Sequence, residues 1–479
     1  MEEILKAALD ETLAHGAIYA EIRFQSDVSE SVLMKNGISE VTDYSQIRGI
    51  SVRALVRNSL GFSATNLCTK RAACKAARKA ITIAHAASRL TSPGVSMDNT
   101  EINQARFEVK PEIPSRDIDL TSKIELLSEG YKAARDSAEQ KGVKLSGCVL
   151  RINLLETEKI IINSDGGEIH SSIPRIALST FLSVSEARRG TTQRFLHLGE
   201  TSGWEAEEKW NLPLLLSEET YTLAGTLLEA RKSPSEKMDI VLGPEVVGLV
   251  CHESCGHPSE ADRILGREAA QAGETYLKPD SAGRRIGSPL VSVVDDPTIP
   301  HSFGFYLYDE EGVKSRKRFL MRKGVIEEFL HNRETATIFE VKSNGSSRAA
   351  AYGYEPIIRM ANTFLEPGDY SREELIEDVK KGVYIKNFME WNIDDRRYHQ
   401  RYVGLEAYKI KDGVLGERVR NPVLEITTEG FWSSVDAVGD DLQFQAAYCG
   451  KGDPMQGIPV WTGGPHIRLR GVRIGGTLL

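Results

Sequence analysis

Apolar and polar residues follow two spacings in the first part of the chain, and the change of spacing marks the predicted elements. Residues 3–14 place apolar side chains at helical spacing, and Gly16 ends that helix. From Ile18 to Phe24 apolar and polar residues alternate, as in a strand with one buried face. Further β-rich runs follow at residues 30–34, 49–56 and 60–65. Together these runs predict a curved antiparallel sheet with short turns.

Two long helical runs come next, at residues 69–88 and 120–140. Alanines form one close-packing face of the first helix, and a basic stripe lies on its other side, at Arg71, Lys75, Arg78 and Lys79. The stripe is predicted to be a solvated face, because no aromatic residues interleave with it to bind nucleic acid. Between the two helices, residues 89–116 contain several prolines and serines and are predicted to be a surface connector.

A second group of strands precedes the predicted domain boundary. These strands are expected at residues 145–153, 158–163 and 168–184, with a turn at residues 165–167. A helical run at residues 218–232 then leads into Ser233, Pro234 and Ser235. Because this short segment interrupts the periodic pattern, the boundary is placed there, between residues 232 and 233.

The second part of the chain is richer in turns than the first. Of the 41 glycines, 14 precede residue 233 and 27 follow it, which favours short antiparallel strands. Strands are predicted at residues 290–295, 306–308, 319–321, 326–330, 402–411 and 422–428, and one helix at residues 371–381. The predicted fold class is therefore α+β. Residues 1–232 form an N-terminal domain of curved antiparallel sheet with long helices, and residues 233–479 form a mainly antiparallel β domain.

Composition is typical of a folded globular protein. The 479 residues are 41% hydrophobic and 27% charged, and no run of eighteen apolar residues predicts a membrane span. The acidic, amphipathic N-terminus does not resemble a secretory signal, so a cytoplasmic location is expected. The net charge of −8 gives no general electrostatic reason to bind nucleic acid. Six cysteines in a chain of this length are expected to be free thiols in a reducing compartment.

The clearest candidate chemistry lies on a predicted helix that begins at Gly243 and Pro244 and carries His252, Glu253 and His257. In a regular helix a five-residue spacing advances ~140° around the axis and ~7.5 Å along it. Two nitrogens that each lie ~2.0 Å from one zinc ion cannot be more than ~4 Å apart. A straight helix therefore cannot place both imidazoles on one metal, and an ordinary polar helix end is an equal alternative on spacing alone.

The sequence suggests how the helix could be distorted. Gly256 is a natural helix terminator, and Pro258 biases His257 out of the α region, so we expect the helix to end near Cys255. A local π-bulge is the other solution. Glu253 would then be the general base beside the first ligand.

A third protein ligand is needed for a hydrolytic site. Glu260 and Asp262 are local candidates, and the residues alone rank Glu260 level with the distant Cys449.

Several segments together resemble the TldD/PmbA family of metallopeptidases. The segment HESCGHPSEAD, from residue 252, is similar to the His-Glu-x-x-x-His signature of that family. Other similar segments occur in the same order along nearly the whole chain: GAIYAEIRFQ, NGISEV, SNGSSRAAAYGYEPIIRMANTFLEPGD, GVYIKNF and YCGKGDPMQGIPVWTGGPHIRLRGVRIGGT. Because the PmbA-type members lack the metal motif, this chain resembles the TldD type.

The resemblance implies a site and an activity. His252, His257 and Cys449 would be zinc ligands and Glu253 the catalytic carboxylate, on a motif helix carried by the C-terminal domain. The implied enzyme is a zinc-dependent peptidase that hydrolyses short or unfolded peptides. It would act as a homodimer, or as a heterodimer with a PmbA-like chain, with an enclosed active site. An antiparallel strand edge in the second part of the chain could take the peptide as an added strand.

Specificity does not follow from the resemblance, because residues 389–394 replace the glycine-rich run that TldD-type chains usually have after GVYIKNF. Arg348, Arg359 and Asn362 lie in a family-like stretch and are candidates to stabilise an oxyanion, with ordinary hydrogen bonding as the alternative. Two other functions remain open. One is a non-catalytic peptide-binding or scaffold subunit with structural zinc, for which Cys255 would be a fourth ligand. The other, disfavoured by the acidic charge, is a nucleic-acid-associated regulator.

Overall fold

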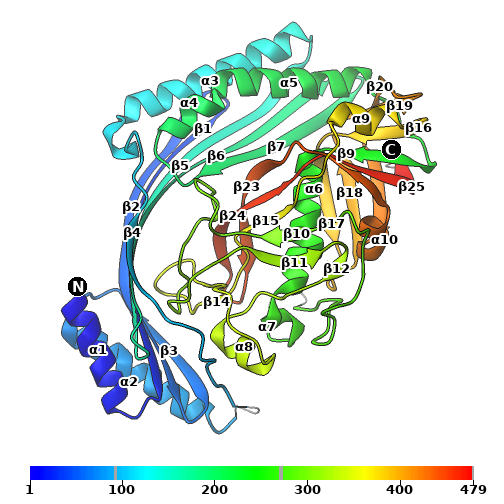
Figure 1. Cartoon of the computed structure of the whole chain (residues 1–479). Helices are drawn as coiled ribbons and strands as arrows, with labels where there is room; N and C mark the ends of the chain where they lie inside the picture. The colour runs from blue at the N-terminus through cyan, green and yellow to red at the C-terminus, as the bar shows by residue number, and fades with distance from the viewer. Residues whose placement is uncertain (91–93, 269–272, 477–479) are drawn as a thin grey trace.

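A long curved sheet arches over a body of shorter strands (Figure 1). The computed structural model describes residues 1–90, 94–268 and 273–476. Its mixture of long helices and antiparallel sheets confirms the predicted α+β class. The division into domains of residues 1–232 and 233–479 stays a prediction. No helix within the described residues is long and apolar enough to cross a membrane.

The arch is a seven-stranded sheet of order β3-β2-β1-β5-β6-β4, with β7 also paired to β6. Its strands are β1 (Tyr19–Lys35), β2 (Ile38–Val56), β3 (Ser59–Thr65), β4 (Gln104–Glu108), β5 (Lys144–Asn163), β6 (Glu168–Glu186) and β7 (Gly190–Glu200). All neighbours are antiparallel except β4 and β6. Two predictions were wrong here. Residues 145–153 and 158–163 form one strand, because β5 pairs without a gap to β1 across residues 149–163. The connector 89–116 contains β4, which pairs with β6.

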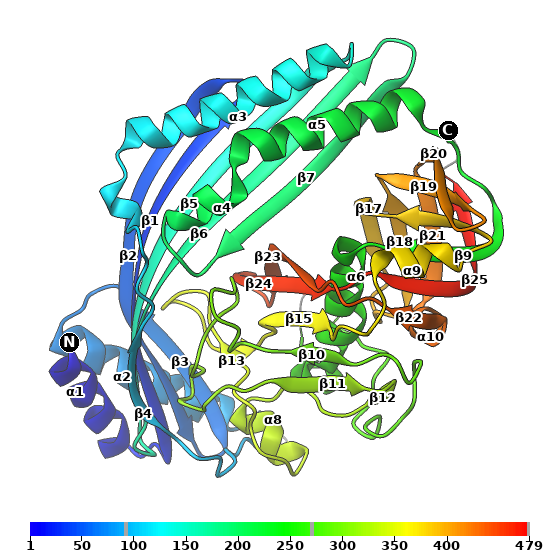
Figure 2. The ribbon, with the colours of Figure 1, turned by 45° about the horizontal axis from the view of Figure 1, so that its top comes forward.

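Helices cover the outer face and one end of the arch (Figures 1 and 2). They are α1 (Glu2–Ala14), α2 (Lys70–Ala87), α3 (Leu120–Gln140), α4 (Glu205–Trp210) and α5 (Leu212–Glu229). The alanine face of α2 is buried, as its spacing predicts. The helix α5 begins earlier than the predicted residue 218, because the Asn211 side chain accepts a hydrogen bond from the Leu214 N–H and caps the first turn. It ends at Glu229, and the next residues pair with the second part of the chain.

The body contains three further sheets. A ten-stranded sheet has the order β17-β18-β21-β25-β9-β16-β19-β20-β8, with β22 on β25; a six-stranded sheet has the order β12-β11-β10-β15-β24-β23; β13 and β14 pair with each other. Their strands are β8 (Arg231–Lys232), β9 (Glu236–Leu242), β10 (Val293–Asp295), β11 (Arg318–Arg322), β12 (Val325–Ile326), β13 (Ser347–Arg348), β14 (Ile357–Ile358), β15 (Asn362–Leu365), β16 (Lys381–Ile385), β17 (Phe388–Ile393), β18 (His399–Gly404), β19 (Ala407–Lys411), β20 (Val414–Arg420), β21 (Pro422–Thr427), β22 (Val435–Val438), β23 (Gln443–Lys451), β24 (Gln456–Gly464) and β25 (Ile467–Gly476). The helices are α6 (Pro244–Cys251), α7 (Ala261–Ile264), α8 (Arg333–Ile338), α9 (Arg372–Glu377) and α10 (Thr428–Ser433).

Sequence patterns were less accurate in this body. The predicted strand 306–308 is not formed, since the Tyr306 hydroxyl and carbonyl bond to Gly345 and Ser315 from loops. The predicted helix 371–381 ends at Glu377, although its predicted capping box between Ser371 and Glu374 is confirmed. The predicted strand 402–411 is two strands, β18 and β19, with different neighbours.

Buried ion pairs join the arch to the body. Arg53 on β2 lies 2.8 Å from Glu21 on β1 and 2.6 Å from Glu311 in a loop of the body. Arg23 on β1 lies 3.1 Å from Glu310 of the same loop. All five side chains are buried. Breaking one member of such a group would leave an unpaired buried charge, so the network fixes where the body sits under the arch.

Candidate metal centre

The two histidines of the motif flank a π-helical turn, which His252 begins and His257 directly follows. α6 begins with Gly243 and Pro244, as predicted, and continues through the π-turn His252–Gly256 into a 3₁₀ turn at residues 257–259. The N–H of His257 donates to the carbonyl of His252, which is the i→i+5 bond of a π-helix. Because this turn is wider than an α-helical one, residues i and i+5 lie one above the other on the same side of the helix. The five-residue spacing is thereby accommodated inside the helix.

The expectation that the helix ends near Cys255 was wrong, and the alternative, a π-bulge, is what forms. Gly256 (φ −61°, ψ −68°) and His257 (φ −56°, ψ −43°) both stay in the right-handed helical region, although Pro258 follows. Gly256 is therefore not a helix terminator. A Cβ at this position would lie 2.0 Å from the Met360 sulfur, so glycine allows the helix to pack against buried Met360.

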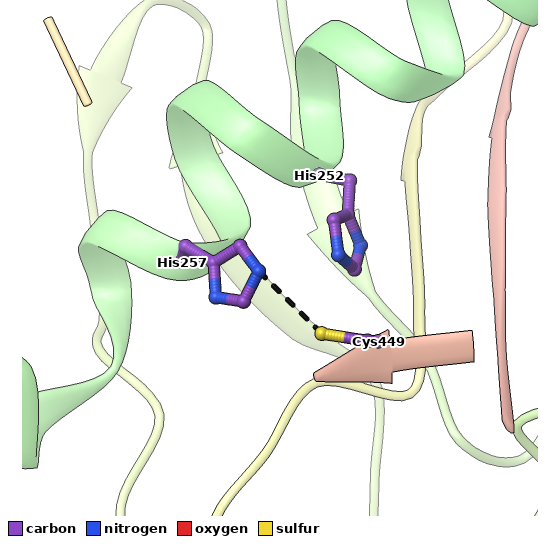
Figure 3. A group of neighbouring side chains, drawn as sticks. All are labelled: His252, His257 and Cys449. Atoms are coloured by element: carbon purple, nitrogen blue, oxygen red, sulfur yellow. Dashed lines mark hydrogen bonds between the residues drawn. The ribbon is translucent and has the colours of Figure 1, made fainter. Parts of the chain in front are cut away.

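His252, His257 and Cys449 come together at this turn (Figure 3). Cys449 projects from β23, while both histidines come from the helical segment. The His257 Nε2 and Cys449 Sγ atoms are 3.4 Å apart, and the two ring centroids are 4.9 Å apart. One donor atom from each side chain lies within 4.8 Å of the others, and all three residues are buried. A nitrogen at ~2.0 Å and a sulfur at ~2.3 Å from one zinc ion are at most ~4.3 Å apart, so small adjustments would let all three bind it.

Glu260 supports this group instead of belonging to it. His257 Nδ1 donates to Glu260 Oε2 at 3.0 Å, which leaves Nε2 directed at Cys449. The other carboxylate oxygen of Glu260 lies 3.4 Å from Lys451 Nζ. Asp262, the second local candidate, accepts a 2.7 Å hydrogen bond from Lys451. Neither carboxylate is part of a group of metal-ligand atoms with the histidines in the described parts of the chain.

The chemistry of the donor set suits a metal ion. Burial raises the pKa of the Cys449 thiol, but the nearby His257, His252 and Arg359 lower it by more than burial raises it. The pKa of Cys449 is therefore well below its ordinary value. A thiolate is the form of cysteine that binds metal. Burial lowers the pKa of His257, whereas Cys449 and Glu260 raise it, to about 9. The Nδ1 atom of His252 is buried and has no hydrogen-bond partner among the described residues, which is costly for a histidine that binds nothing.

Cys255 does not complete a closed four-ligand site. It is absent from the group of ligand atoms formed by the described residues, and burial raises the pKa of its thiol to about 12. Burial likewise raises the pKa of Cys251 well above its ordinary value. Both cysteines belong to the hydrophobic core, as expected for two buried residues on one helix face.

Glu253 lines a cavity of about 920 Å³, together with the two histidines. Its lining comes from α6 and the turns that follow it, from β7, β17, β23 and β24, and from the loops next to β17 and β23. The residues that depart from the TldD pattern, 389–394, lie on and just after β17, and five of the six line the cavity. On that side Arg397 donates a hydrogen bond to the Glu253 carboxylate. Sequence reasoning missed Arg397, although the departure from the family pattern ends only three residues before it.

The three residues considered for an oxyanion do not line this cavity. Arg359 donates to the carbonyls of Cys449 and, at 2.7 Å, Gln456. Arg348 donates to the Met360 carbonyl at 2.6 Å, and Asn362 to the Asp296 carbonyl at 2.6 Å. They hold backbone segments together, so hydrogen bonding is the role that the structure gives them.

The sequence matches the PmbA/TldA metallopeptidase family in three segments. Residues 20–84 match its domain 1, residues 113–228 its central domain and residues 235–476 its C-terminal domain. A metalloprotease from Methanothermobacter thermautotrophicus is 34% identical over 464 residues, which cover 96% of each chain. A metalloprotease TldD homolog from Buchnera aphidicola is 26% identical over 490 residues, which cover 98% of this chain and 95% of the relative. A zinc metalloprotease TldD homolog from Saccharolobus solfataricus is 30% identical over 238 residues, about half of each chain.

Solved structures share the fold over nearly the whole chain. A candidate DNA gyrase modulator from Thermotoga maritima has a TM-score of 0.78 at 16% identity and covers 99% of this chain and 100% of its own. TldE from Thermococcus kodakarensis has a TM-score of 0.75 at 17% identity and covers the same shares. The resemblance that the motifs suggest is thus confirmed along nearly the whole sequence, and the chain belongs to the PmbA/TldA metallopeptidase family.

Proposed function

We propose that this metallopeptidase uses zinc, held by His252, His257 and Cys449, to hydrolyse short or unfolded peptides. The observation that carries the proposal is the convergence of three buried donor atoms beside Glu253 at the wall of a cavity. Two imidazoles and one thiolate favour zinc over magnesium or calcium. The relative from Saccharolobus solfataricus that is named a zinc metalloprotease supports the same metal.

Glu253 is the proposed general base. Bound zinc would supply Lewis-acid polarisation and an acidified water molecule. The Glu253 carboxylate takes one proton from the attacking water as the new C–O bond forms. It then gives that proton to the leaving amine nitrogen as the C–N bond breaks, so the carboxylate is regenerated. Its position next to His252 in the sequence and its exposure to the cavity both suit this role.

The substrate is proposed to bind as an added strand on β23. This strand is the last of its sheet, and residues 445–450 line the cavity. The Trp461 N–H of β24 donates toward β15, to the Ala361 carbonyl at 3.1 Å. Because Ala446 lies opposite Trp461, its peptide groups point away from β24, toward the open edge. Recognition through the main chain would accept many sequences, provided that the peptide is extended.

A dimer is proposed on the basis of an exposed strand edge in the arch, on β2. Residues 38–48 of β2 pair only with β1 among the described strands, and this stretch exposes Ile38, Val41, Tyr44 and Ile47. An exposed apolar strand edge is a template for pairing with another chain. We propose that an identical chain or a PmbA-like chain pairs there. We also propose that the chain divides into two domains between residues 232 and 233 and that the protein is cytoplasmic.

The principal competing function is a peptide-binding or scaffold subunit with structural zinc. Glu253 argues against it, because a structural site needs no carboxylate that opens onto a cavity next to its ligand. A nucleic-acid-associated regulator is not favoured by the net charge of −8.

The substitution Glu253→Ala tests the catalytic proposal. We expect zinc content equal to that of the parent and no measurable cleavage of an unfolded polypeptide. The surface carboxylate variant Glu327→Ala is the control and should cleave as the parent does. Unchanged cleavage by Glu253→Ala would refute the assigned role.

A further inference from the structure

Arg397 occupies a turn that fixes its backbone next to the site. It lies between β17 and β18 with φ 60°, in the left-handed region that a β-carbon disfavours. Its carbonyl accepts from the Thr428 hydroxyl at 2.9 Å, and the preceding carbonyl, of Arg396, accepts from the Tyr276 N–H at 2.9 Å. Glycine or asparagine would suit this conformation better, so the turn itself gives no reason for an arginine.

The guanidinium group has spare donors inside the cavity. Among the described residues that line the cavity, Arg397 is the only lysine or arginine. Its side chain is 15% exposed and donates to the Glu253 carboxylate through Nη1. A guanidinium carries five N–H donors. The guanidinium forms no other hydrogen bond with the part of the chain that the structure describes.

During the proposed reaction, negative charge near Arg397 passes from the Glu253 carboxylate to the substrate. When water attacks, its proton goes to Glu253, and the carbonyl π electrons go to the substrate oxygen. The negative charge thus leaves the carboxylate that Arg397 pairs with and appears on an atom of the reacting group beside it. The Arg397 guanidinium loses its charged partner when Glu253 is protonated, and it has donors free for the new negative charge. It therefore interacts more strongly with the transition state than with the bound substrate.

We propose that Arg397 is a catalytic residue that donates hydrogen bonds to the tetrahedral intermediate of peptide hydrolysis. The proposal rests on the proposed peptidase function. The same guanidinium could instead bind the free C-terminal carboxylate of a peptide, since arginine also pairs with carboxylates. The position of Arg397 favours the intermediate, because it contacts the base itself and the base must lie next to the scissile bond.

The test uses two variants of Arg397 and a matched control. Arg397→Gln removes the charge, and Arg397→Gly also suits the left-handed backbone and should fold at least as stably as the parent. The control is Arg396→Gln in the same turn, whose side chain is 72% exposed and pairs with Glu274 at 3.0 Å. Zinc content, melting temperature, kcat and KM are measured for each, with matched peptides that end in a free carboxylate or an amide. The affinity for a phosphinic peptide, which carries a tetrahedral phosphorus at the scissile position, is measured by calorimetry.

We expect both Arg397 variants to hold as much zinc as the parent and to lose about 10²–10³-fold in kcat, on free-acid and amidated peptides alike. Affinity for the phosphinic peptide should fall in parallel with kcat/KM, whereas KM changes little. Added guanidinium should restore part of the activity of Arg397→Gly. Arg396→Gln should behave as the parent.

Two outcomes would overturn the role of Arg397 while the peptidase function stands. One is wild-type kcat in Arg397→Gln with zinc retained. The other is a loss confined to free-acid peptides, which would make Arg397 a subsite for the terminal carboxylate. If the parent itself holds zinc and cleaves no peptide, the proposed function fails, and the role of Arg397 fails with it.

Discussion

The cavity has two unlike walls. One is the helical wall, residues 244–260 together with β23, and the other is the hairpin wall, β17 together with residues 394–398. Every residue from His252 to Glu260 is buried, whereas none from Phe388 to His399 is. On the helical wall the proposed metal ligand His257 is oriented by Glu260, which in turn lies beside Lys451. On the hairpin wall most side chains that line the cavity form no hydrogen bond or ion pair with another described residue, apart from those of Asp394 and Arg397.

This difference separates two tasks. A metal site needs donor atoms held within a few tenths of an ångström, and buried partners provide that precision. A surface that meets varied peptides needs shape and apolar area, and it tolerates exposed side chains. Arg397 is the exception on the hairpin wall, because its backbone is anchored and its side chain reaches the opposite wall. The comparison therefore predicts metal-linked defects from one wall and substrate-linked defects from the other.

Of two substitutions that compare a supporting residue of one wall with an apolar residue of the other, the larger effect is expected from Glu260→Gln on the helical wall. The amide would still accept from His257 but would lose the charge that raises the basicity of the imidazole and that faces Lys451. We expect zinc affinity to fall about 10–100-fold, with activity restored by excess zinc. Competition with a chelating dye measures the affinity, and Glu274→Gln, a surface carboxylate, is the control. Unaltered zinc affinity would mean that the buried partners of this wall do not support the metal site.

A smaller and different effect is expected from the hairpin wall, through Trp391→Ala. The indole is 38% exposed and lines the cavity. Removing it should lower kcat/KM for peptides with a large apolar residue by about tenfold relative to peptides with a small one, because an apolar contact is lost only for the former. Zinc content and melting temperature should stay at parent values, as in the control Tyr370→Ala, which lies outside the cavity lining. A uniform loss on all peptides, or a loss of zinc, would remove the distinction between the walls.

The sequence predicted the helical wall better than the hairpin wall. The spacing of His252 and His257 required a distorted helix, and a π-bulge was one of the two solutions. The choice between them depends on the close packing of Gly256 against Met360, which only the tertiary structure provides. Cys449 could be assigned only through family resemblance, because a strand far along the chain brings it to the histidines. Arg397 could not be assigned, since its contact depends on the left-handed turn that aims it at Glu253.

The same contrast holds for the fold. Long elements such as α3 and β6 were predicted because many residues repeat one spacing, so local pattern and final structure agree. Short elements in the body were predicted poorly. Residues 306–308 are held by loop contacts instead of a strand ladder, and Asn211 starts α5 earlier than its apolar spacing suggests. In such cases a few side-chain hydrogen bonds outweigh local propensity.

The central claim is a three-ligand zinc site that hydrolyses peptides, and metal content measured together with cleavage tests it most directly. The parent, His257→Ala and Cys449→Ser are purified, and zinc per chain and cleavage of an unfolded polypeptide are measured in the same samples. The account predicts about one zinc per chain in the parent, and loss of both zinc and cleavage in each variant. Zinc retained in Cys449→Ser, or a parent that binds no metal and cleaves nothing, would contradict it.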